Sequence, residues 1–410
     1  MGQAKPFEIS KQVVWEAYKR VKANKGAAGV DKQSIQEFEE RLKNNLYKLW
    51  NRMSSGSYFP PPVREVEIPK RDGRKRALGI PTVSDRIAQM VVKMYLEPKV
   101  EPYFHEDSYG YRPKKSAIEA LGITRQRCWR YDWVLDLDIR GFFDNLDHEL
   151  LMRAVRKHTD SEWILLYVER WLKAPVQLKN GTLVKREKGT PQGGVASPLL
   201  ANLFLHYALD EWMRRNYPDI VFARYADDAV FHCRTEAEAQ MLKKAIGERL
   251  AHCKLELHPE KTKIVYCKDD QRRGDYSNKK FEFLGYTFRG RLSKSRMGKR
   301  FVGFSPAVSR EAAKSMRSAM RSWRLHRASN KTLEDIADGI NPVLRGWINY
   351  YGRYRKSALY PIFQHLNCTL MRWAMWKYKR LKGCSRKAKQ WLDQVSRHDP
   401  DLFAHWQMGL

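Results

Sequence analysis

Residues 133–139 alternate aspartate with apolar side chains, in the order Trp-Val-Leu-Asp-Leu-Asp-Ile. Successive side chains of a strand point to opposite faces, so Asp136 and Asp138 would share one face, with Leu135 and Leu137 on the other. Two like charges on one face of a core strand are costly unless a cation neutralises them. The pattern therefore predicts a core strand that carries either a cation-binding carboxylate pair or, as the alternative, a structural ion pair.

A second acidic pair lies at residues 222–231, where apolar segments flank Asp227 and Asp228. Two short apolar runs around such a tip predict a β-hairpin that presents two adjacent carboxylates. Carboxylate oxygens are the ligands that Mg²⁺ prefers, and two ions about 4 Å apart can activate a hydroxyl and stabilise a leaving phosphate oxygen. An exposed Asp-Asp turn is the alternative, but the glycine-rich loop 189–194 between the two acidic motifs favours a metal site.

The charge balance indicates a polyanionic partner. The 410 residues include 77 Lys+Arg against 46 Asp+Glu, a formal net charge of +31. More than half of this excess lies from residue 291 onward, interleaved with tryptophan and tyrosine, which favours nucleic acid. No uncharged apolar run of about 18 residues exists, so we expect no membrane partner. Six scattered cysteines without a C-x-x-C pair predict reduced thiols and no zinc site.

The periodicity of apolar residues predicts a mixed α+β chain that becomes all-helical late. We expect strands at 63–68 and 76–80, joined by a basic turn, then a strand at 133–139, a hairpin at 221–233 and a strand at 281–288. Helices are expected within 7–55 and at 83–95, 145–175, 198–213 and 236–253, and from residue 306 onward.

These motifs carry a family resemblance. Tyr225-Ala226-Asp227-Asp228 resembles the catalytic signature of reverse transcriptases, and residues 189–202 resemble the Gln-Gly motif of bacterial group II intron reverse transcriptases. Residues 24–31, 66–70, 78–86, 108–113, 283–286 and 345–351 also match that family, in order. The resemblance implies a right-hand polymerase: an N-terminal helical extension at 1–60, fingers and palm at 61–290, an α-helical thumb or maturase domain at 291–375, and a basic C-terminal tail at 376–410.

The resemblance also implies catalytic roles. Asp138, Asp227 and Asp228 would bind two Mg²⁺ ions, with Mn²⁺ as a substitute, and Asp136 would be an accessory acid. Lys261 matches the lysine proposed to protonate the leaving pyrophosphate. Lys263 is a close rival, and a plain surface lysine is the alternative.

Five residues are expected to contact the incoming deoxynucleotide. By resemblance, Lys70 and Arg76 reach its triphosphate, while Gln192 and Gly193 pack on the nucleotide and the templating base. Phe143 falls where reverse transcriptases exclude a ribose 2′-OH. The alternative for Lys70 and Arg76 is a solvated basic turn. For Gln192 and Gly193 it is an ordinary loop, and for Phe143 it is plain core packing.

RNA contacts are expected from a basic rim of the helical region and from the motif at 108–113. Lysine and arginine on such a rim bind phosphates, and this binding weakens with salt. A helical core with a solvated basic surface is the alternative. The residues concerned are Arg112, Arg345, Arg353, Arg355, Lys356, Arg372 and Lys377.

The resemblance thus implies an RNA-directed DNA polymerase that transfers nucleotides from dNTPs to a primer 3′-OH and, as a maturase, binds structured intron RNA for splicing and retromobility. Its expected partners are intron RNA, an RNA template/DNA primer duplex, dNTPs and target DNA. We expect it in the bacterial cytoplasm, associated with the nucleoid when it acts on DNA. Its expected oligomeric state is a monomer or a homodimer. The alternatives are a reverse transcriptase recruited to DNA repair or phage defence, and a splicing cofactor that acts mainly by binding RNA.

Overall fold

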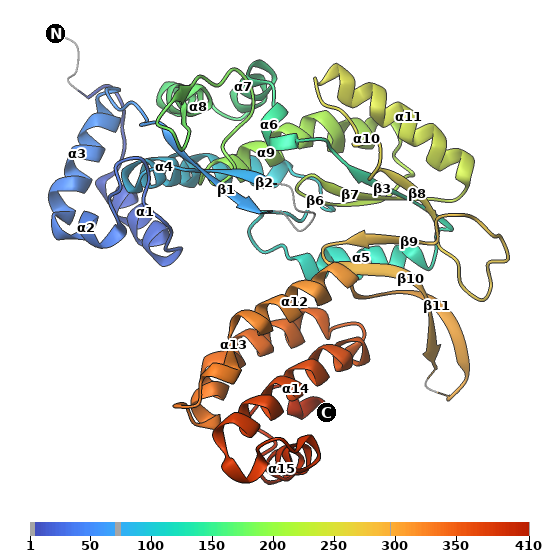
Figure 1. Cartoon of the computed structure of the whole chain (residues 1–410). Coiled ribbons are helices and arrows are strands. Elements are labelled where there is room, and N and C mark those ends of the chain that lie inside the picture. Colours follow the sequence, from blue (N-terminus) through green and yellow to red (C-terminus); the bar gives the residue numbers. More distant parts are fainter. Residues whose placement is uncertain (1–4, 70–74, 296, 410) are drawn as a thin grey trace. The chain divides into compact units, whose positions relative to one another are not determined.

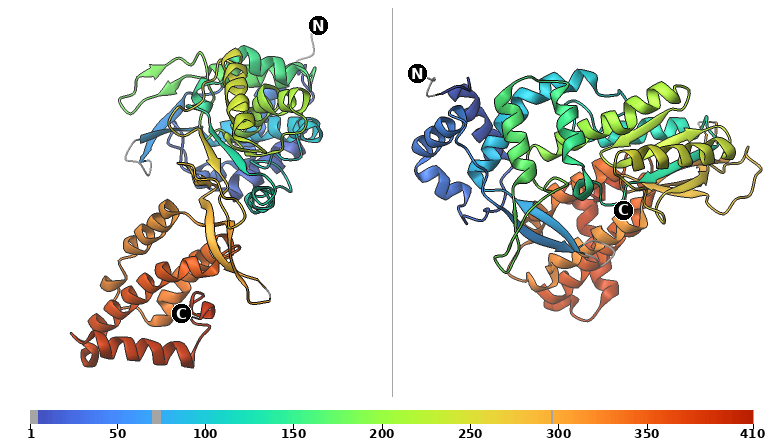
Figure 2. Two further views of the ribbon diagram at one scale, coloured as in Figure 1. Left: turned by 90° about the vertical axis from the view of Figure 1, so that its right-hand side faces the viewer. Right: turned by 90° about the horizontal axis from the view of Figure 1, so that it is seen from above.

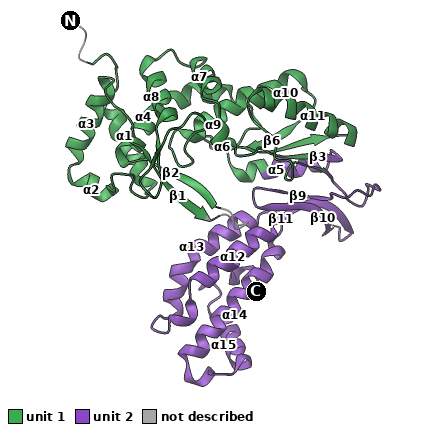
Figure 3. Cartoon of the chain, turned by 45° about the horizontal axis from the view of Figure 1, so that its top comes forward, with its two compact units in different colours: residues 1–120, 135–264 green, residues 121–134, 265–410 purple. Residues whose placement is uncertain are grey.

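The computed structural model describes residues 5–69, 75–295 and 297–409, so Lys70 lies outside the described residues. The chain divides into two compact units (Figure 3). The first comprises Met1–Ala120 and Leu135–Ile264, and the second comprises Leu121–Val134 and Val265–Leu410. None of the described helices is long and apolar enough to cross a membrane.

The first unit begins with three helices, α1 (Lys11–Ala23), α2 (Ile35–Glu40) and α3 (Leu42–Ser54). The expected basic hairpin follows as β1 (Val63–Pro69) and β2 (Lys75–Ile80), which pair antiparallel. These strands form a four-stranded sheet in the order β2-β1-β4-β5, with β4 (Val176–Gln177) and β5 (Leu183–Val184). The long helix α4 (Val83–Val100) comes next in the chain and extends the helix expected at 83–95.

A second four-stranded sheet has the order β6-β7-β3-β8 (Figure 1). Its strands are β3 (Trp133–Asp138), β6 (Phe222–Tyr225), β7 (Asp228–Cys233) and β8 (Lys263–Tyr266). In β3, Leu135 and Leu137 are buried, whereas Asp136 and Asp138 are partly exposed, as the alternation predicts. Helices α6 (Phe142–Asn145), α7 (His148–Arg156), α8 (Glu162–Lys173), α9 (Ser197–Leu205), α10 (Glu211–Asn216) and α11 (Glu236–His252) complete this unit.

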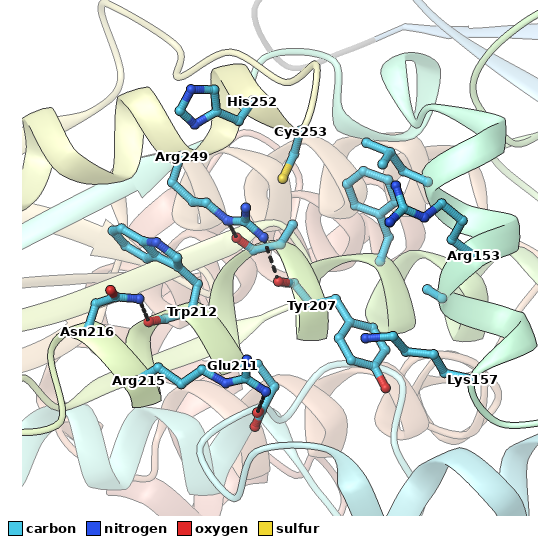
Figure 4. Close-up of a pocket in the computed structure, with 14 residues that line it drawn as sticks. Arg153, Lys157, Tyr207, Glu211, Trp212, Arg215, Asn216, Arg249, His252 and Cys253 are labelled. Carbon is cyan, nitrogen blue, oxygen red and sulfur yellow. Dashed lines mark hydrogen bonds and ion pairs between the residues drawn. The ribbon is translucent and has the colours of Figure 1, made fainter.

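The helix expected at 198–213 is confirmed as an uninterrupted helical segment that runs from Ser197 to Asn216, in which a π-helical turn at His206–Asp210 lies between α9 and α10. The wider turn leaves backbone carbonyls to be satisfied by other groups. Arg249 of α11 does this, because its Nε donates to the Ala208 carbonyl at 3.0 Å and its Nη2 to the Tyr207 carbonyl at 3.0 Å (Figure 4). Such π turns occur mostly as single-turn insertions within α-helices and are frequent at functional sites.

The second unit contains a three-stranded sheet in the order β11-β10-β9. Its strands are β9 (Lys280–Phe283), β10 (Tyr286–Lys294) and β11 (Arg300–Val308). The single strand expected at 281–288 is therefore wrong. Leu284 and Gly285 both adopt left-handed backbone conformations, with φ of 50° and 78°, and this two-residue turn folds the chain back. The all-helical region starts at Arg310 rather than at 306, because β11 continues to Val308.

Four helices then surround one apolar core (Figure 1). They are α12 (Arg310–Ser322), α13 (Leu333–Tyr351), α14 (Tyr360–Lys377) and α15 (Ser385–His398). Phe363 and Trp373 of α14 are fully buried in this core, and Leu392 and Phe403 join the same cluster. Residues after 376 therefore contribute to the core, although the sequence marks them as a basic tail.

Candidate functional site

The β6–β7 hairpin presents the second acidic pair as the sequence predicts. Tyr225 pairs with Asp228 across the two strands, and Ala226-Asp227 forms a two-residue turn between them. Ala226 has φ of 58°, a left-handed conformation that a non-glycine residue rarely adopts. Surrounding contacts must hold this turn in place, since an unsupported residue would relax from it.

Part of this support comes from residues 108–113. A side chain at Gly110 would place its Cβ 2.4 Å from the backbone nitrogen of Ala226, so only glycine fits there. The amide of Tyr109 donates to the Arg224 carbonyl at 2.8 Å, and the Asn202 side-chain amide donates to the Gly110 carbonyl. The motif at 108–113 is thus a backbone support for the acidic hairpin.

Arg224 supports the same turn from inside. Its side chain is fully buried, and its Nη1 donates to the Ala226 carbonyl at 2.9 Å. The sequence motifs predict a role for neither this residue nor its acidic partner Asp210. An arginine flanked by apolar residues within a core strand is the signal that could have revealed a buried ion pair.

Asp138 lies at the end of β3 and contacts the segment that contains Lys261. Lys261 Nζ lies 2.9 Å from Asp138 Oδ2. The amide of His258 donates to the Asp138 carbonyl at 2.8 Å, and the Thr262 hydroxyl donates to the same carbonyl at 3.3 Å. These bonds fix the segment against β3. Of the two rival lysines, Lys261 contacts the acidic site, while Lys263 is exposed on β8.

Asp138 and Asp227 are close enough to influence each other electrostatically. Burial raises the pKa of Asp227, and the negative charge of Asp138 raises it further, while Arg76 and Lys261 counteract this shift. Four charged groups that are distant in sequence therefore share one site. Within the part of the chain that the structure describes, no three histidine, cysteine or acidic side chains are already gathered as a metal-binding group. The donor chemistry nevertheless fits a hard divalent cation, since Asp138 and Asp227 are carboxylates that influence each other electrostatically and Lys261 already places positive charge on Asp138.

Arg76 and Gln192 meet beside this site. Arg76 Nε donates to Gln192 Oε1, and Gln192 Nε2 donates to Asp144 Oδ1 at 3.3 Å. The loop is held against β2, because the amide of Gly79 donates to the Gln192 carbonyl at 2.9 Å. Gly193 has φ of 128°, and a Cβ on it would lie 2.6 Å from the Gly79 carbonyl oxygen, so the approach requires glycine.

Phe143 is buried, with 7% of its surface exposed, and its ring centroid lies 5.5 Å from that of Phe142. Its carbonyl accepts a hydrogen bond from the amide of Thr190 at 2.8 Å. Phe143 therefore connects α6 to the glycine-rich loop. Its role in selecting deoxynucleotides stays a prediction.

Arg112 points inward. Its Nη1 donates to the carbonyls of His105 at 2.6 Å and Ser108 at 2.7 Å, and its Nη2 pairs with Glu101 at 2.8 Å. These bonds favour a structural role for Arg112 over the RNA contact expected from the sequence.

The other expected RNA contacts lie in the second unit. Four of them are exposed: Arg345, Arg353, Lys356 and Arg372. Arg355 donates to the Leu292 carbonyl at 3.2 Å, and Lys377 donates to the Lys331 carbonyl. The four exposed residues are therefore accessible to phosphates from solvent, whereas Arg355 and Lys377 already donate to backbone carbonyls.

Comparison with known proteins identifies the class of protein to which this arrangement belongs. A family model described as "Reverse transcriptase (RNA-dependent DNA polymerase)" matches residues 68–288, which include the acidic hairpin and the end of β3. A second model, "Group II intron, maturase-specific domain", matches residues 313–391 in the helical region. The class defined by the fold and the site is therefore that of the RNA-directed DNA polymerases.

Individual relatives help to identify the family within this class of protein. The chain is 32% identical to the protein YkfC of Escherichia coli (strain K12) over 294 residues, which cover 62% of this chain and 77% of YkfC. It is 33% identical to the group II intron-encoded protein LtrA of Lactococcus lactis subsp. cremoris over 268 residues, which cover 63% of this chain and 43% of LtrA. The chain belongs to the group II intron-encoded reverse transcriptases and maturases.

Proposed function

We propose that this chain extends a primer 3′-OH with deoxynucleotides on an RNA template, by two-metal nucleotidyl transfer at Asp138, Asp227 and Asp228. The observation that carries the proposal is the meeting of Asp138 and Asp227 with Lys261 and Arg76. Bound Mg²⁺ would activate the primer hydroxyl and stabilise the leaving pyrophosphate. In a right-hand polymerase, the first unit would supply fingers and palm, and helices α12–α14 the thumb.

The chain's own residues have separable roles in this proposal. Arg76 and Gln192 would orient the nucleotide, because each donates hydrogen bonds beside the acidic site. Lys70 would act with Arg76 on the triphosphate, and Phe143 would exclude a ribose 2′-OH. Lys261 would hold its proton beside the departing phosphate oxygen, as its position against Asp138 allows.

Primer extension on an RNA template tests the proposal. We expect extension with dNTPs in Mg²⁺ or Mn²⁺, little extension with rNTPs, and none with a chelator. Asp227→Asn should abolish extension while the affinity for the primer–template stays close to that of the parent protein. Extension by Asp227→Asn at the parental rate would contradict the assignment. Glu236→Gln is a matched control because Glu236 is a carboxylate at the start of α11, outside the described site.

We further propose that the helical region binds structured intron RNA and assists splicing. The maturase-specific match at 313–391 and the exposed Arg345, Arg353, Lys356 and Arg372 support this role. Replacing these four residues by alanine should weaken RNA binding and reduce the salt slope of log K by up to about four. A reduced salt slope with unchanged primer extension would separate RNA binding from catalysis, and an unchanged slope would place the RNA contact elsewhere.

A further inference from the structure

Strands β10 and β11 form a long two-stranded ribbon that no described function uses (Figure 2). Nine residue pairs connect them, from Tyr286↔Val308 to Lys294↔Arg300. The near half is anchored, since Phe288 and Phe304 are fully buried, whereas the far half is largely exposed. The match to the reverse transcriptase family model ends at residue 288, and the match to the maturase model begins at residue 313. Most of this ribbon, residues 286–308, therefore lies outside both matches.

The ribbon carries only positive charge. Residues 284–310 include no aspartate or glutamate, and residues 286–308 include six lysines and arginines. Lys294 lies directly opposite Arg300 in the strand register, and both side chains are exposed. Like charges in this relation destabilise a strand pair. A polyanion seated on the ribbon would remove that cost.

A cluster of guanidinium groups lies closer to the anchored half of the ribbon than Lys294 and Arg300 do. Arg291 donates to the carbonyls of Ser305 and Thr287, both at 3.1 Å, and Arg355 of the following helical region donates to the Leu292 carbonyl at 3.2 Å. Burial and the charges of Arg289 and Arg355 lower the pKa of Arg291 to about 10. Three cations thus lie together at the base of the exposed half, where phosphates would neutralise them.

The far end combines this charge with exposed apolar side chains. Met297 is 96% exposed, Leu292 56% and Phe301 38%. Basic β-ribbons with apolar ends can enter a groove of DNA, where the apolar groups insert between base steps. Such insertion is a mode of binding to the minor groove of B-form DNA, whereas double-stranded RNA is recognised mostly through its shape, phosphates and 2′-hydroxyls.

We propose that the β10–β11 ribbon is a duplex-DNA-binding arm that enters a groove of B-form DNA, with its cations on the phosphates and Met297 at the bases. This surface goes beyond the polymerase and RNA-binding roles proposed above. It would allow the chain to bind double-stranded DNA outside the polymerase site.

Binding to a blunt DNA duplex and to an RNA duplex of the same sequence tests the arm. The variant Lys294→Ala/Lys299→Ala/Arg300→Ala removes three exposed cations from the ribbon. We expect its affinity for duplex DNA to fall at least about tenfold and its salt slope to fall by about two to three, with a much smaller change on duplex RNA. The control Arg156→Ala/Lys243→Ala/Lys244→Ala removes the same charge from α7 and α11 and should leave DNA binding nearly unchanged.

Two outcomes would overturn the proposal: unchanged DNA binding by the ribbon variant, or equal losses on both duplexes, which would indicate a general polyanion surface. Primer extension on a short annealed primer–template, measured at saturating enzyme, should stay normal in this variant, so the arm can fail without the polymerase failing. As a second measurement, 2-aminopurine in the DNA should brighten on binding the parent protein and not on binding Met297→Ser. Equal brightening by both proteins would overturn the insertion of Met297.

Discussion

Arg224 and Asp210 form a fully buried, two-pronged ion pair. Arg224 Nε lies 2.8 Å from Asp210 Oδ1, Nη2 pairs with Oδ2, and neither side chain is exposed to solvent. The same guanidinium donates to the Asn202 side chain at 3.1 Å and to the Ala226 carbonyl at 2.9 Å. Because Asp210 ends the π-helical turn, the pair ties that turn to the strained tip that carries Asp227.

Removing one partner of this pair should strongly destabilise the first unit. Asp210→Asn leaves a buried guanidinium without its counter-charge, and the loss of one buried partner costs about 3–5 kcal/mol. We expect the free energy of unfolding, measured by urea denaturation, to fall by that amount. A fall of less than about 1 kcal/mol would show that water or a rearranged side chain replaces Asp210.

Removing both charges tests separately whether the ion pair stabilises the fold and whether it positions the turn at Ala226. The double variant Arg224→Met/Asp210→Leu leaves no buried charge and should regain most of the lost stability, since apolar groups often replace buried ion pairs well. It still lacks the bond to the Ala226 carbonyl. We therefore expect it to fold and yet show a lower kcat for primer extension, with little change in primer–template affinity. Normal kcat in a stable double variant would assign the pair a purely structural role.

Gly110 offers a second test of the support under the same turn. In Gly110→Ala, the new Cβ meets the Ala226 backbone nitrogen at 2.4 Å, and a backbone atom cannot move aside as a flexible side chain can. Overpacking of this kind costs about 1–3 kcal/mol, so we expect a lower melting temperature and slower primer extension.

Gly339 is a matched control for this substitution. It lies within α13, and a Cβ there meets nothing within 4 Å. Gly339→Ala should therefore raise stability by about 0.5–1 kcal/mol through better helix propensity. Equal effects of the two substitutions on primer extension would contradict a specific role for Gly110.

The sequence predicts the strand bearing Asp138 and the hairpin bearing Asp227, because both depend on local alternation and turn patterns. It does not separate Lys261 from Lys263, because that choice depends on how the segment from His258 packs along the end of β3. The ion pair of Arg224 with Asp210 also escapes local patterns, since its partners lie 14 residues apart on different elements. Residues that position the hairpin are thus not evident from local sequence patterns, and the chemical roles expected of Asp138, Asp227 and Lys261 stay predictions.

The two lysines now give a direct comparison. Lys261→Met removes the ammonium group that contacts Asp138, so we expect kcat for primer extension to fall by roughly 10²-fold or more, the range typical of a lost general acid. Lys263→Met, on the exposed face of β8, should leave kcat nearly unchanged. Similar losses in both variants would argue that nearby positive charge, and not a proton from Lys261, is what the site uses.

Asp85 gives a prediction about pH. It is buried on α4 and accepts hydrogen bonds from Tyr58 at 2.8 Å, Trp171 at 2.7 Å and Gln89 at 3.0 Å. Burial raises the pKa of Asp85 to about 6, although these bonds oppose the shift. Gln89 also accepts a bond from the amide of Val195 at 2.8 Å, so Asp85 anchors the chain just after the glycine-rich loop.

The sign of the effect follows from proton binding. Between about pH 4 and pH 6 the folded protein holds a proton on Asp85 that the unfolded chain has lost, so this residue's contribution to stability declines as pH rises through that window. A shift of about two units corresponds to roughly 3 kcal/mol. Asp85→Asn cannot titrate, so the difference in unfolding free energy between the parent protein and this variant should change by that amount from pH 4 to pH 7, with the parent losing stability relative to the variant. A difference that stays constant over this range would mean that Asp85 titrates at its ordinary pKa.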